Sequence, residues 1–542
     1  MRPGTNWGEG ENPLMKGAIA VLFALLGLAV ITASAGAGEN DSGYTTAQPA
    51  MLKPLTPEGS VKPIINVGET VNGYMFDSIP DGIALTTNGR GTADVYVNHE
   101  LSLVPFLGRS DYTNSIVSRL RLNQHSAGVL KGDYVIPSSA NYQRFCSNFL
   151  VGPAHGFERE LLLTNEEARD IVLRSGYAWH PPFVSLSEPT AEQAGVVVAL
   201  DVKSGAYRSI YGMGRHNHEN DVAVPGYGHP VVLSGDDTFD APASQLYLYS
   251  AASGSALWND EGKLYALVSD NPAVNDYGDF PAAGSVSASF VEVPRMIATG
   301  KKADGSEVRA SDFGYPGPPA GVPDGPQWVL EYWSHNVVRA FQFIRVEDIA
   351  YDRNNPRIVY FADTGEPRAI PDGAGRLRRG PSGTRGLYPN GRIFKLVLDS
   401  SDPLKVTSLS LLADFDAGGY NNPAVPHQPD NVETTGRSVL FQEDPGSHNQ
   451  GAVGYAKIWR YTLPAGPLVP VAQVDQSQKP AITPGNWESS GIIDASVAFG
   501  PGAFLVDIQA HGWELKTDPS PFPGTNYALE AGQLLLFRLP GS

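Results

Sequence analysis

The sequence predicts an all-β fold, a six-bladed β-propeller with long inserted loops. Two features of the chain indicate this class. Glycine and proline are abundant, at 59 and 44 of 542 residues, which is typical of a fold with many tight turns. Short runs rich in branched and aromatic residues recur along the chain, several directly after a glycine-containing turn. Examples of these runs are 195–200, 245–249, 263–268, 357–361, 392–396, 457–461 and 533–537.

Such a turn–strand rhythm favours repeated antiparallel hairpins, and therefore a propeller. A pair of β-sandwiches is the alternative, because the spacing of the runs is irregular. One helix is expected, over residues 165–174.

The N-terminus predicts export. Lys16 precedes an apolar run over residues 18–31, and Ala33 and Ala35 fit a small-residue cleavage site. This order describes a secretory signal peptide over residues 1–35. The run is shorter than the ~20 residues of a membrane span, so we expect no membrane span after cleavage and a periplasmic or extracellular protein. An uncleaved anchor is the alternative.

The rest of the chain is expected to form one domain. Residues 36–65 are rich in small and turn-forming residues and predict a flexible leader. Residues 66–542 are assigned to a single propeller. Strand signals are sparse near 271–327 and 363–390, which indicates two insertions on which functional residues could lie. We expect a monomer.

Charge and cysteine content narrow the function classes. The formal net charge of −18 disfavours a nucleic-acid partner, because an acidic surface repels phosphate backbones. The acidic residues could simply form a soluble surface. The more specific interpretation is that some carboxylates are concentrated in one place and neutralised by calcium or magnesium. Cys146 is the single cysteine of the chain, so the chain has no internal disulfide and no cysteine-rich zinc site. Bound cations could stabilise the fold in place of disulfides.

Seven clusters place acids or amides beside strand ends. If the fold brings them to the propeller axis, their mutual repulsion must be offset by cations or protons. No HExxH, GxSxG, GxxxxGK[ST] or GxGxxG motif is present, which disfavours a zinc protease, an α/β-hydrolase and the common nucleotide-binding folds. The clusters lie at 98–100, 164–167, 214–219, 235–237, 345–348, 428–431 and 487–490.

Taken in order, these clusters resemble the PhoX-type alkaline phosphatases, a family of exported metal-dependent propellers. The matching pieces are Asn98-His-Glu100, Thr164-Asn-Glu-Glu167, Gly214-Arg-His-Asn-His-Glu219, Gly235-Asp-Asp237, Lys263-Leu-Tyr265, Arg345-Val-Glu-Asp348 and Pro429-Asp-Asn431.

The resemblance implies a cluster of ferric iron and calcium at the axis that hydrolyses phosphate monoesters. Carried over by motif, Arg345 and Glu347 are the catalytic candidates. Arg345, as a phosphate clamp, and Asn165 are the candidates for binding substrate. The metal-ligand candidates are Glu100, Glu166, Glu219, Glu347, Asp348 and Asp430.

The sequence departs from the family in three places. The residue after the clamp arginine is Val346, where the family has proline. The family's iron-ligating cysteine precedes the acidic pair, where this chain has Asn165, and Cys146 belongs to an earlier segment. Loss of a soft ligand favours calcium over iron, so calcium is the expected cofactor and iron the alternative. No Arg-Arg pair precedes the apolar run, which favours export by the general route.

The sequence therefore predicts a hydrolase of small phosphate esters that uses carboxylate-bound cations. Two alternatives stay open. One is a calcium-stabilised propeller without catalysis that binds a ligand or partner. The other is a phytase-like or lactonase-like propeller hydrolase.

Overall fold

The computed structural model describes residues 42–106, 108–174, 191–239, 243–280, 283–373, 375–445 and 454–542. The predicted signal peptide lies outside these residues, as do residues 36–41 of the predicted leader. The part of the chain from Asp41 onward forms one unit. No helix in the described ranges is long and apolar enough to cross a membrane.

Six antiparallel blades of four strands, one of them with a fifth strand, make up this unit, which confirms the predicted all-β propeller. Four blades are each built from strands in the order of the chain, some with short elements inserted between them. Their strands, from the inside outward, are β5 (Pro80–Thr87), β6 (Thr92–His99), β8 (Ile116–Asn123) and β9 (Val129–Ile136); β10 (Phe145–Val151), β11 (Leu161–Glu166), β14 (Val197–Asp201) and β15 (Tyr207–Ile210); β16 (His218–Ala223), β17 (Val231–Asp236), β18 (Leu246–Ser250) and β19 (Lys263–Ser269); and β21 (Val346–Tyr351), β22 (Ile358–Asp363), β25 (Arg392–Leu398) and β26 (Lys405–Asp414).

The last two blades are completed by the N-terminal segment. Strand β1 (Leu52–Pro54) pairs with β30, and β2 (Ser60–Asn66) pairs with β33. The strands of these blades are β27 (Pro429–Thr434), β28 (Ser438–Glu443), β29 (Lys457–Thr462) and β30 (Leu468–Val474); and β31 (Glu488–Asp494), β32 (Ala503–Pro519) and β33 (Asn526–Arg538).

The flexible leader predicted over residues 36–65 is therefore wrong for residues 42–65. Both ends of the chain meet in one sheet, and this pairing closes the ring of blades without a disulfide. Polar and proline-rich composition did not reveal these strands, because their partners lie hundreds of residues away.

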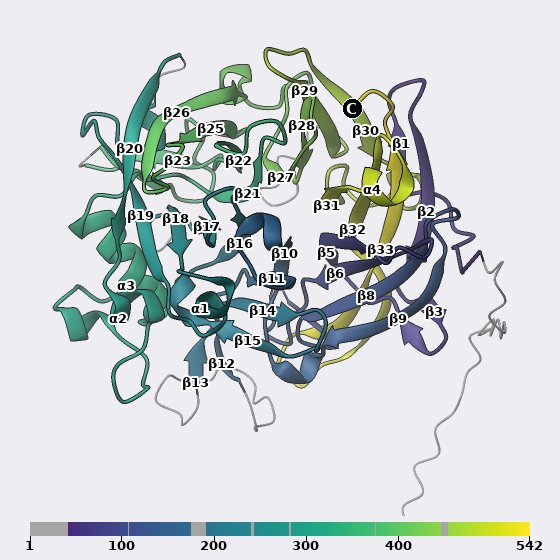
Figure 1. The fold of residues 1–542 in the computed structure, drawn as a ribbon, viewed down its shortest axis with the longest axis horizontal. Coiled ribbons are helices and arrows are strands. Elements are labelled where there is room, and N and C mark those ends of the chain that lie inside the picture. Colours follow the sequence, from purple (N-terminus) through teal and green to yellow (C-terminus); the bar gives the residue numbers. More distant parts are fainter. Residues whose placement is uncertain are drawn as a thin grey trace, which may run out of the picture. The chain divides into compact units, whose positions relative to one another are not determined.

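The innermost strands surround a central axis (Figure 1). Each one contacts the next, in the order β5, β10, β16, β21, β27, β31 and back to β5. Apolar side chains fill the space between neighbouring blades; for example, Ala84 and Val117 pack with Leu162 and Val198. Blades buried on both faces explain why strands such as β14 read as nearly continuous apolar runs.

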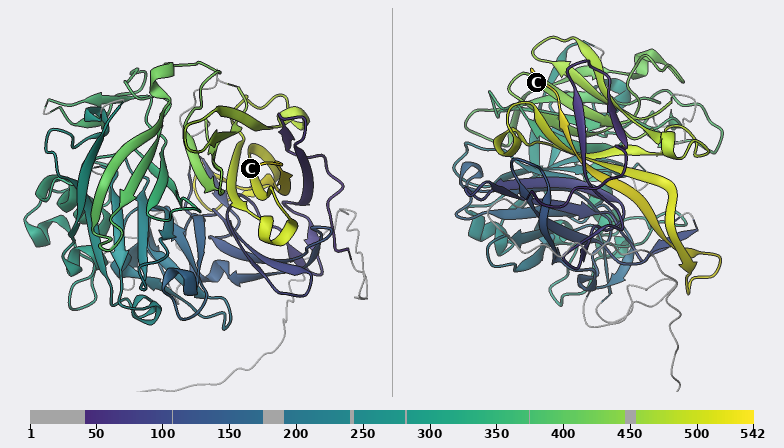
Figure 2. Two further views of the ribbon diagram at one scale, coloured as in Figure 1. Left: turned by 45° about the horizontal axis from the view of Figure 1, so that its top comes forward. Right: turned by 90° about the vertical axis from the view of Figure 1, so that its right-hand side faces the viewer.

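The remaining elements decorate this ring. Strand β20 (Ser285–Glu292) joins β19 to β26, so two blades share one nine-stranded sheet. The hairpin β32–β33 extends past its blade (Figure 2) and pairs with β7 (Arg109–Asp111). Other short elements are β3 (Thr70–Val71), β4 (Tyr74–Met75), β12 (Ile171–Leu173), β13 (Ala191–Gln193), β23 (Ala369–Pro371), β24 (Leu377–Arg379), α1 (Gly254–Trp258), α2 (Arg295–Thr299), α3 (Pro326–Tyr332) and α4 (Ser496–Phe499).

The two predicted insertions contain some of these elements. Residues 271–327 include β20 and α2, and residues 363–390 include the β23–β24 hairpin. The helix predicted over residues 165–174 is wrong. Its first residues end strand β11 and its last ones form β12, because pairing within a buried sheet overrides helix propensity.

The role of the N-terminal strand is testable. Ile65 in β2 is fully buried and packs among Val95, Leu120 and Leu534. We expect Ile65→Ala to lower the free energy of unfolding by about 2–5 kcal/mol, measured by chemical denaturation. Ser60→Ala at the exposed start of the strand is the control, with an expected change within about 0.5 kcal/mol. Equal stability of both variants and the wild type would contradict a structural role for β2.

Candidate metal centre

The innermost strands share one local irregularity. In five of them the pairing with the second strand skips two consecutive residues, as in a β-bulge. A bulge re-aims side chains that regular alternation would place differently. The skipped pairs are Asp81-Gly82, Cys146-Ser147, Glu219-Asn220, Glu347-Asp348 and Asp430-Asn431.

The first residue of each skipped pair lines a large cavity of about 990 Å³, and the second lines a smaller one. The sixth strand, β31, adds Glu488 to the large cavity. Each blade thus contributes one ionisable side chain. Gly82 is required at its bulge, because a Cβ there would lie 2.6 Å from backbone atoms of Ser147 and Asn148.

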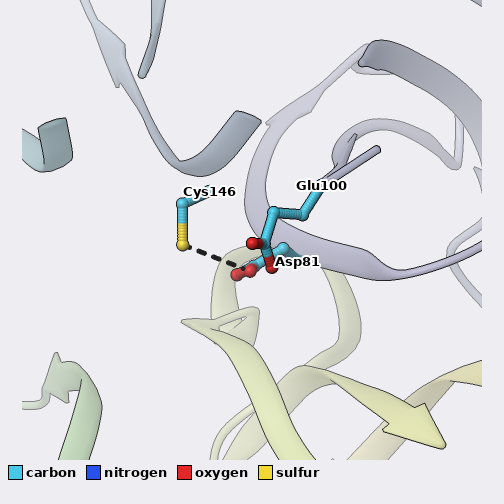
Figure 3. Close-up of side chains that lie close together, drawn as sticks. All are labelled: Asp81, Glu100 and Cys146. Atoms are coloured by element: carbon cyan, nitrogen blue, oxygen red, sulfur yellow. Dashed lines mark hydrogen bonds between the residues drawn. The ribbon is translucent and has the colours of Figure 1, made fainter. Parts of the chain in front are cut away.

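A second set of acids reaches the same cavity from the ends of second strands. Glu100, Glu167, Asp237 and Asp444 each lie one residue past such a strand. The side chains around this cavity form four groups whose ligand atoms lie within 4.8 Å of one another, and Glu100, Glu167 and Asp444 each belong to one of them. The groups are Asp81, Glu100 and Cys146 (Figure 3); Cys146, Glu167 and Glu219; Glu219, Glu347 and Asp430; and Asp430, Asp444 and Glu488.

Cys146 lies at the junction of two of these groups. Its Sγ donates to Glu219 Oε1 at 3.1 Å and to Asp81 Oδ2 at 3.3 Å. Although Cys146 belongs to an earlier segment than the acidic pair, it therefore lies among the candidate ligands. The bulge in β10 turns this thiol toward the axis, a placement that the spacing in sequence does not reveal.

Burial and mutual repulsion raise the pKa values of most acids of the centre. Burial, followed by the charge of Asp81, raises the pKa of Glu100 to about 8. Burial raises the pKa of Asp81 to about 6 and the pKa values of Glu167, Glu219, Glu347, Asp430 and Glu488 well above the usual range. Burial and the charges of Asp81 and Glu219 likewise raise the pKa of the Cys146 thiol. Without cations, Glu100 and the acids whose pKa lies well above the usual range would hold protons at neutral pH.

The donor set fits cations. The group of Glu219, Glu347 and Asp430 offers oxygen atoms alone, as calcium prefers, whereas two groups add the sulfur of Cys146, which suits a softer transition metal. Within the described ranges, Asp81 Oδ1 is buried without a hydrogen-bond partner. Neighbours orient the ligands. Gln509 donates to Asp81 at 3.0 Å, and Thr364 donates to Glu347 at 2.7 Å.

Three of the candidate ligands taken from sequence, Glu100, Glu219 and Asp430, lie in this centre, together with Glu347, which was also a catalytic candidate. Glu166 does not. It is fully buried away from the cavity and forms a bidentate ion pair with Arg174, with distances of 2.7 and 3.0 Å. It also accepts the backbone N–H groups of Gln143, Gly195 and Val196. Its neighbour Glu167 takes the predicted place.

Asp348 and Asn165 are also misplaced by the sequence interpretation. Asp348 lines the smaller cavity and accepts the N–H groups of Ile349 at 2.6 Å and Val432 at 2.8 Å. Asn165 is fully buried between β11 and β16. In the amide orientation that satisfies both of its atoms, it donates to Asp221 Oδ2 at 2.7 Å and accepts the Asp221 N–H at 2.9 Å. Asn165 is therefore a sheet-bridging residue without access to substrate.

Arg345 lines the large cavity, as the sequence predicts for a clamp. Its guanidinium forms a two-pronged ion pair with Asp237 and lies 3.1 Å from Glu347 Oε1. Further arginines line the cavity, namely Arg109, Arg144, Arg169, Arg368 and Arg379. Among these, Arg169 has no carboxylate within ion-pair distance in the part of the chain that the structure describes.

Sequence reasoning placed Glu167, Asp237 and Glu488 in its acid clusters without naming them as ligands, and it placed Asp81, Cys146 and Asp444 in none of the clusters. A signal for some of them exists. Four innermost strands carry an acid followed by Gly, Asn or Asp near their first residue, at 81–82, 219–220, 347–348 and 430–431. Nothing comparable marks Cys146.

No protein-family model matches this chain, and no curated protein matches its sequence. Solved structures similar to it include an endo-arabinase from Bacteroides thetaiotaomicron VPI-5482, with 10% identity and a TM-score of 0.30, covering 74% of this chain and 97% of that one. The NanB sialidase from Streptococcus pneumoniae has 8% identity and a TM-score of 0.34, and the match covers 85% of this chain and 68% of the sialidase chain. Similarity at this level carries no conclusion about substrate or activity.

Proposed function

We propose that this chain is an exported, metal-dependent hydrolase of phosphate monoesters, similar to the PhoX-type alkaline phosphatases. The observation that carries the proposal is the convergence of one ionisable side chain from each of six blades on a single cavity that arginines also line. Cations held by carboxylates, beside guanidinium groups, form an environment that suits a phosphate dianion. The signal sequence predicted at residues 1–35 supports export.

Calcium fits the oxygen-only group of Glu219, Glu347 and Asp430. Iron fits the groups that include Cys146, so the position of this thiol supports iron, against the expectation drawn from Asn165. When bound, the cations would supply Lewis acidity and positive charge toward phosphate oxygens.

The protein's own residues would bind and orient the ester. Arg169, which lacks a carboxylate partner in the described ranges, is suited to hold a phosphate oxygen. Arg345 is held in place by Asp237 and would direct its positive charge toward the same group. Thr364 and Gln509 keep the carboxylates Glu347 and Asp81 in fixed orientations, so little reorganisation accompanies binding.

Release of phosphate from an aryl phosphate by the purified mature protein tests the proposal. We expect turnover after loading with calcium and iron, and no turnover of an aryl lactone or of phytate at comparable rates. A metal-loaded protein that hydrolyses only the lactone or phytate would favour the alternative hydrolases. Failure on every substrate would favour a non-catalytic propeller.

A further inference from the structure

A second polar cavity lies at the axis, on the other side of the bulges. It has a volume of about 180 Å³ and is lined by the second residues of the skipped pairs. Four of its polar side chains come from four different blades, namely Asn148, Asn220, Asp348 and Asn431. We refer to these four residues as the channel site.

The three asparagines present amide oxygens without partners. The side chains of Asn148, Asn220 and Asn431 have exposed fractions of 6%, 5% and 2%, and the Oδ1 atom of each has no hydrogen-bond partner in the described part of the chain. Hydrogen bonds from the amide nitrogens orient two of them, Asn148 and Asn220. Asn148 Nδ2 donates to the Gly82 carbonyl at 2.7 Å, and Asn220 Nδ2 donates to Asp348. Buried acceptors left unpaired cost about 1–3 kcal/mol each.

Asp348 adds a negative charge to these acceptors. Its carboxylate is 6% exposed and accepts hydrogen bonds from Asn220 and two backbone N–H groups. No lysine, arginine or histidine of the described residues lies within ion-pair distance of it.

We propose that the channel site binds a calcium ion through the Asp348 carboxylate and the amide oxygens of Asn148, Asn220 and Asn431. Calcium accepts six to eight oxygen ligands in irregular geometry, and water or backbone carbonyls would complete the shell. A water molecule alone is a poorer partner, because it donates two hydrogen bonds to three acceptors and leaves the charge of Asp348 uncompensated.

The ion would act as a structural staple. Its ligands belong to β10, β16, β21 and β27, so one cation would connect four blades at the axis of a ring that contains no disulfide. The site is separate from the large cavity, and the proposal does not depend on phosphatase activity.

Calorimetric titration of calcium into chelator-dialysed mature protein, with thermal melts at each calcium level, tests the site. We expect Asn431→Leu to bind one calcium fewer per chain than the wild type and to show a smaller calcium-dependent rise in Tm. Glu219→Gln, in the large cavity, is the matched control. This variant should retain the calcium of the channel site. In the protein that carries both substitutions, the losses in calcium-dependent Tm rise of the two single variants should therefore add.

An empty channel site would give a different result. If the cavity holds no ion, Asn431→Leu replaces an unsatisfied buried amide by an apolar side chain and should raise Tm with or without calcium. Unchanged calcium stoichiometry would likewise overturn the proposal.

A second variant covers the case in which Asn431→Leu does not fold. Asn431→Asp adds a second carboxylate beside Asp348, so we expect a lower Tm without calcium. The calcium concentration that gives half of the rise in Tm should be at least tenfold lower than in the wild type. A Tm that falls without recovering in calcium would contradict a cation at this site.

Discussion

Glu167→Gln is expected to lower kcat/KM for an aryl phosphate by roughly 10²-fold or more while leaving the fold intact. Glu167 shares a ligand group with Cys146 and Glu219. Loss of a ligand charge should cost at least the 10–100-fold that removal of a partner behind a metal ligand typically costs. Steady-state kinetics and metal content by elemental analysis measure the effect, and we expect the two to fall together.

The adjacent variant Glu166→Gln is the matched control, because the substitution is chemically identical. Glu166 and Glu192 both pair with the buried guanidinium of Arg174, and loss of one partner of a buried ion pair costs up to about 3–5 kcal/mol. We therefore expect a lower free energy of unfolding with kcat/KM within about twofold of the wild type at a permissive temperature. Loss of activity in Glu166→Gln with full activity in Glu167→Gln would reverse the assignment and restore the one drawn from sequence.

Removal of cations is expected to abolish turnover and to make stability strongly dependent on pH. In the cation-free protein burial holds the pKa of Asp81 at about 6 and that of Glu100 at about 8, above their unfolded values of about 3.9 and 4.3. A carboxyl whose folded pKa is raised stabilises the fold below its unfolded pKa, and this contribution is lost as pH rises through the folded pKa. The Tm of the chelated protein should therefore fall between about pH 4 and pH 8.

Calcium should reverse this trend, since the ligands bind it in their ionised forms. The difference in Tm between loaded and chelated protein should grow as pH rises over the same range, as measured by differential scanning calorimetry. Glu100→Gln removes one titrating group and should flatten the slope of the chelated protein. A chelated protein whose Tm rises with pH would show that these carboxylates ionise in the fold without cations.

Several features of the molecule were evident before its structure. Recurrent strand signals and turn residues predicted the propeller, because short antiparallel hairpins are local in sequence. Acids at strand ends, among them Glu100, Glu219, Glu347 and Asp430, predicted where ligands would gather. A propeller brings the starts of its innermost strands and the ends of its second strands to one axis.

Three further features depended on contacts that are distant in sequence. The segment at residues 60–66 became a strand because β33 offers it an edge. Cys146 entered the centre because the bulge in β10 turns it toward Asp81 and Glu219. Glu167, and not Glu166, lines the cavity because the ion pair with Arg174 holds Glu166 on the other side of the strand.

The sequence by itself determined the class of fold and the kinds of ligand available to it. Only the tertiary structure decided which member of each adjacent pair, such as Glu347 and Asp348, lines the large cavity. The reason is that a bulge replaces the regular alternation of a strand, and its direction depends on how neighbouring blades pack around the axis.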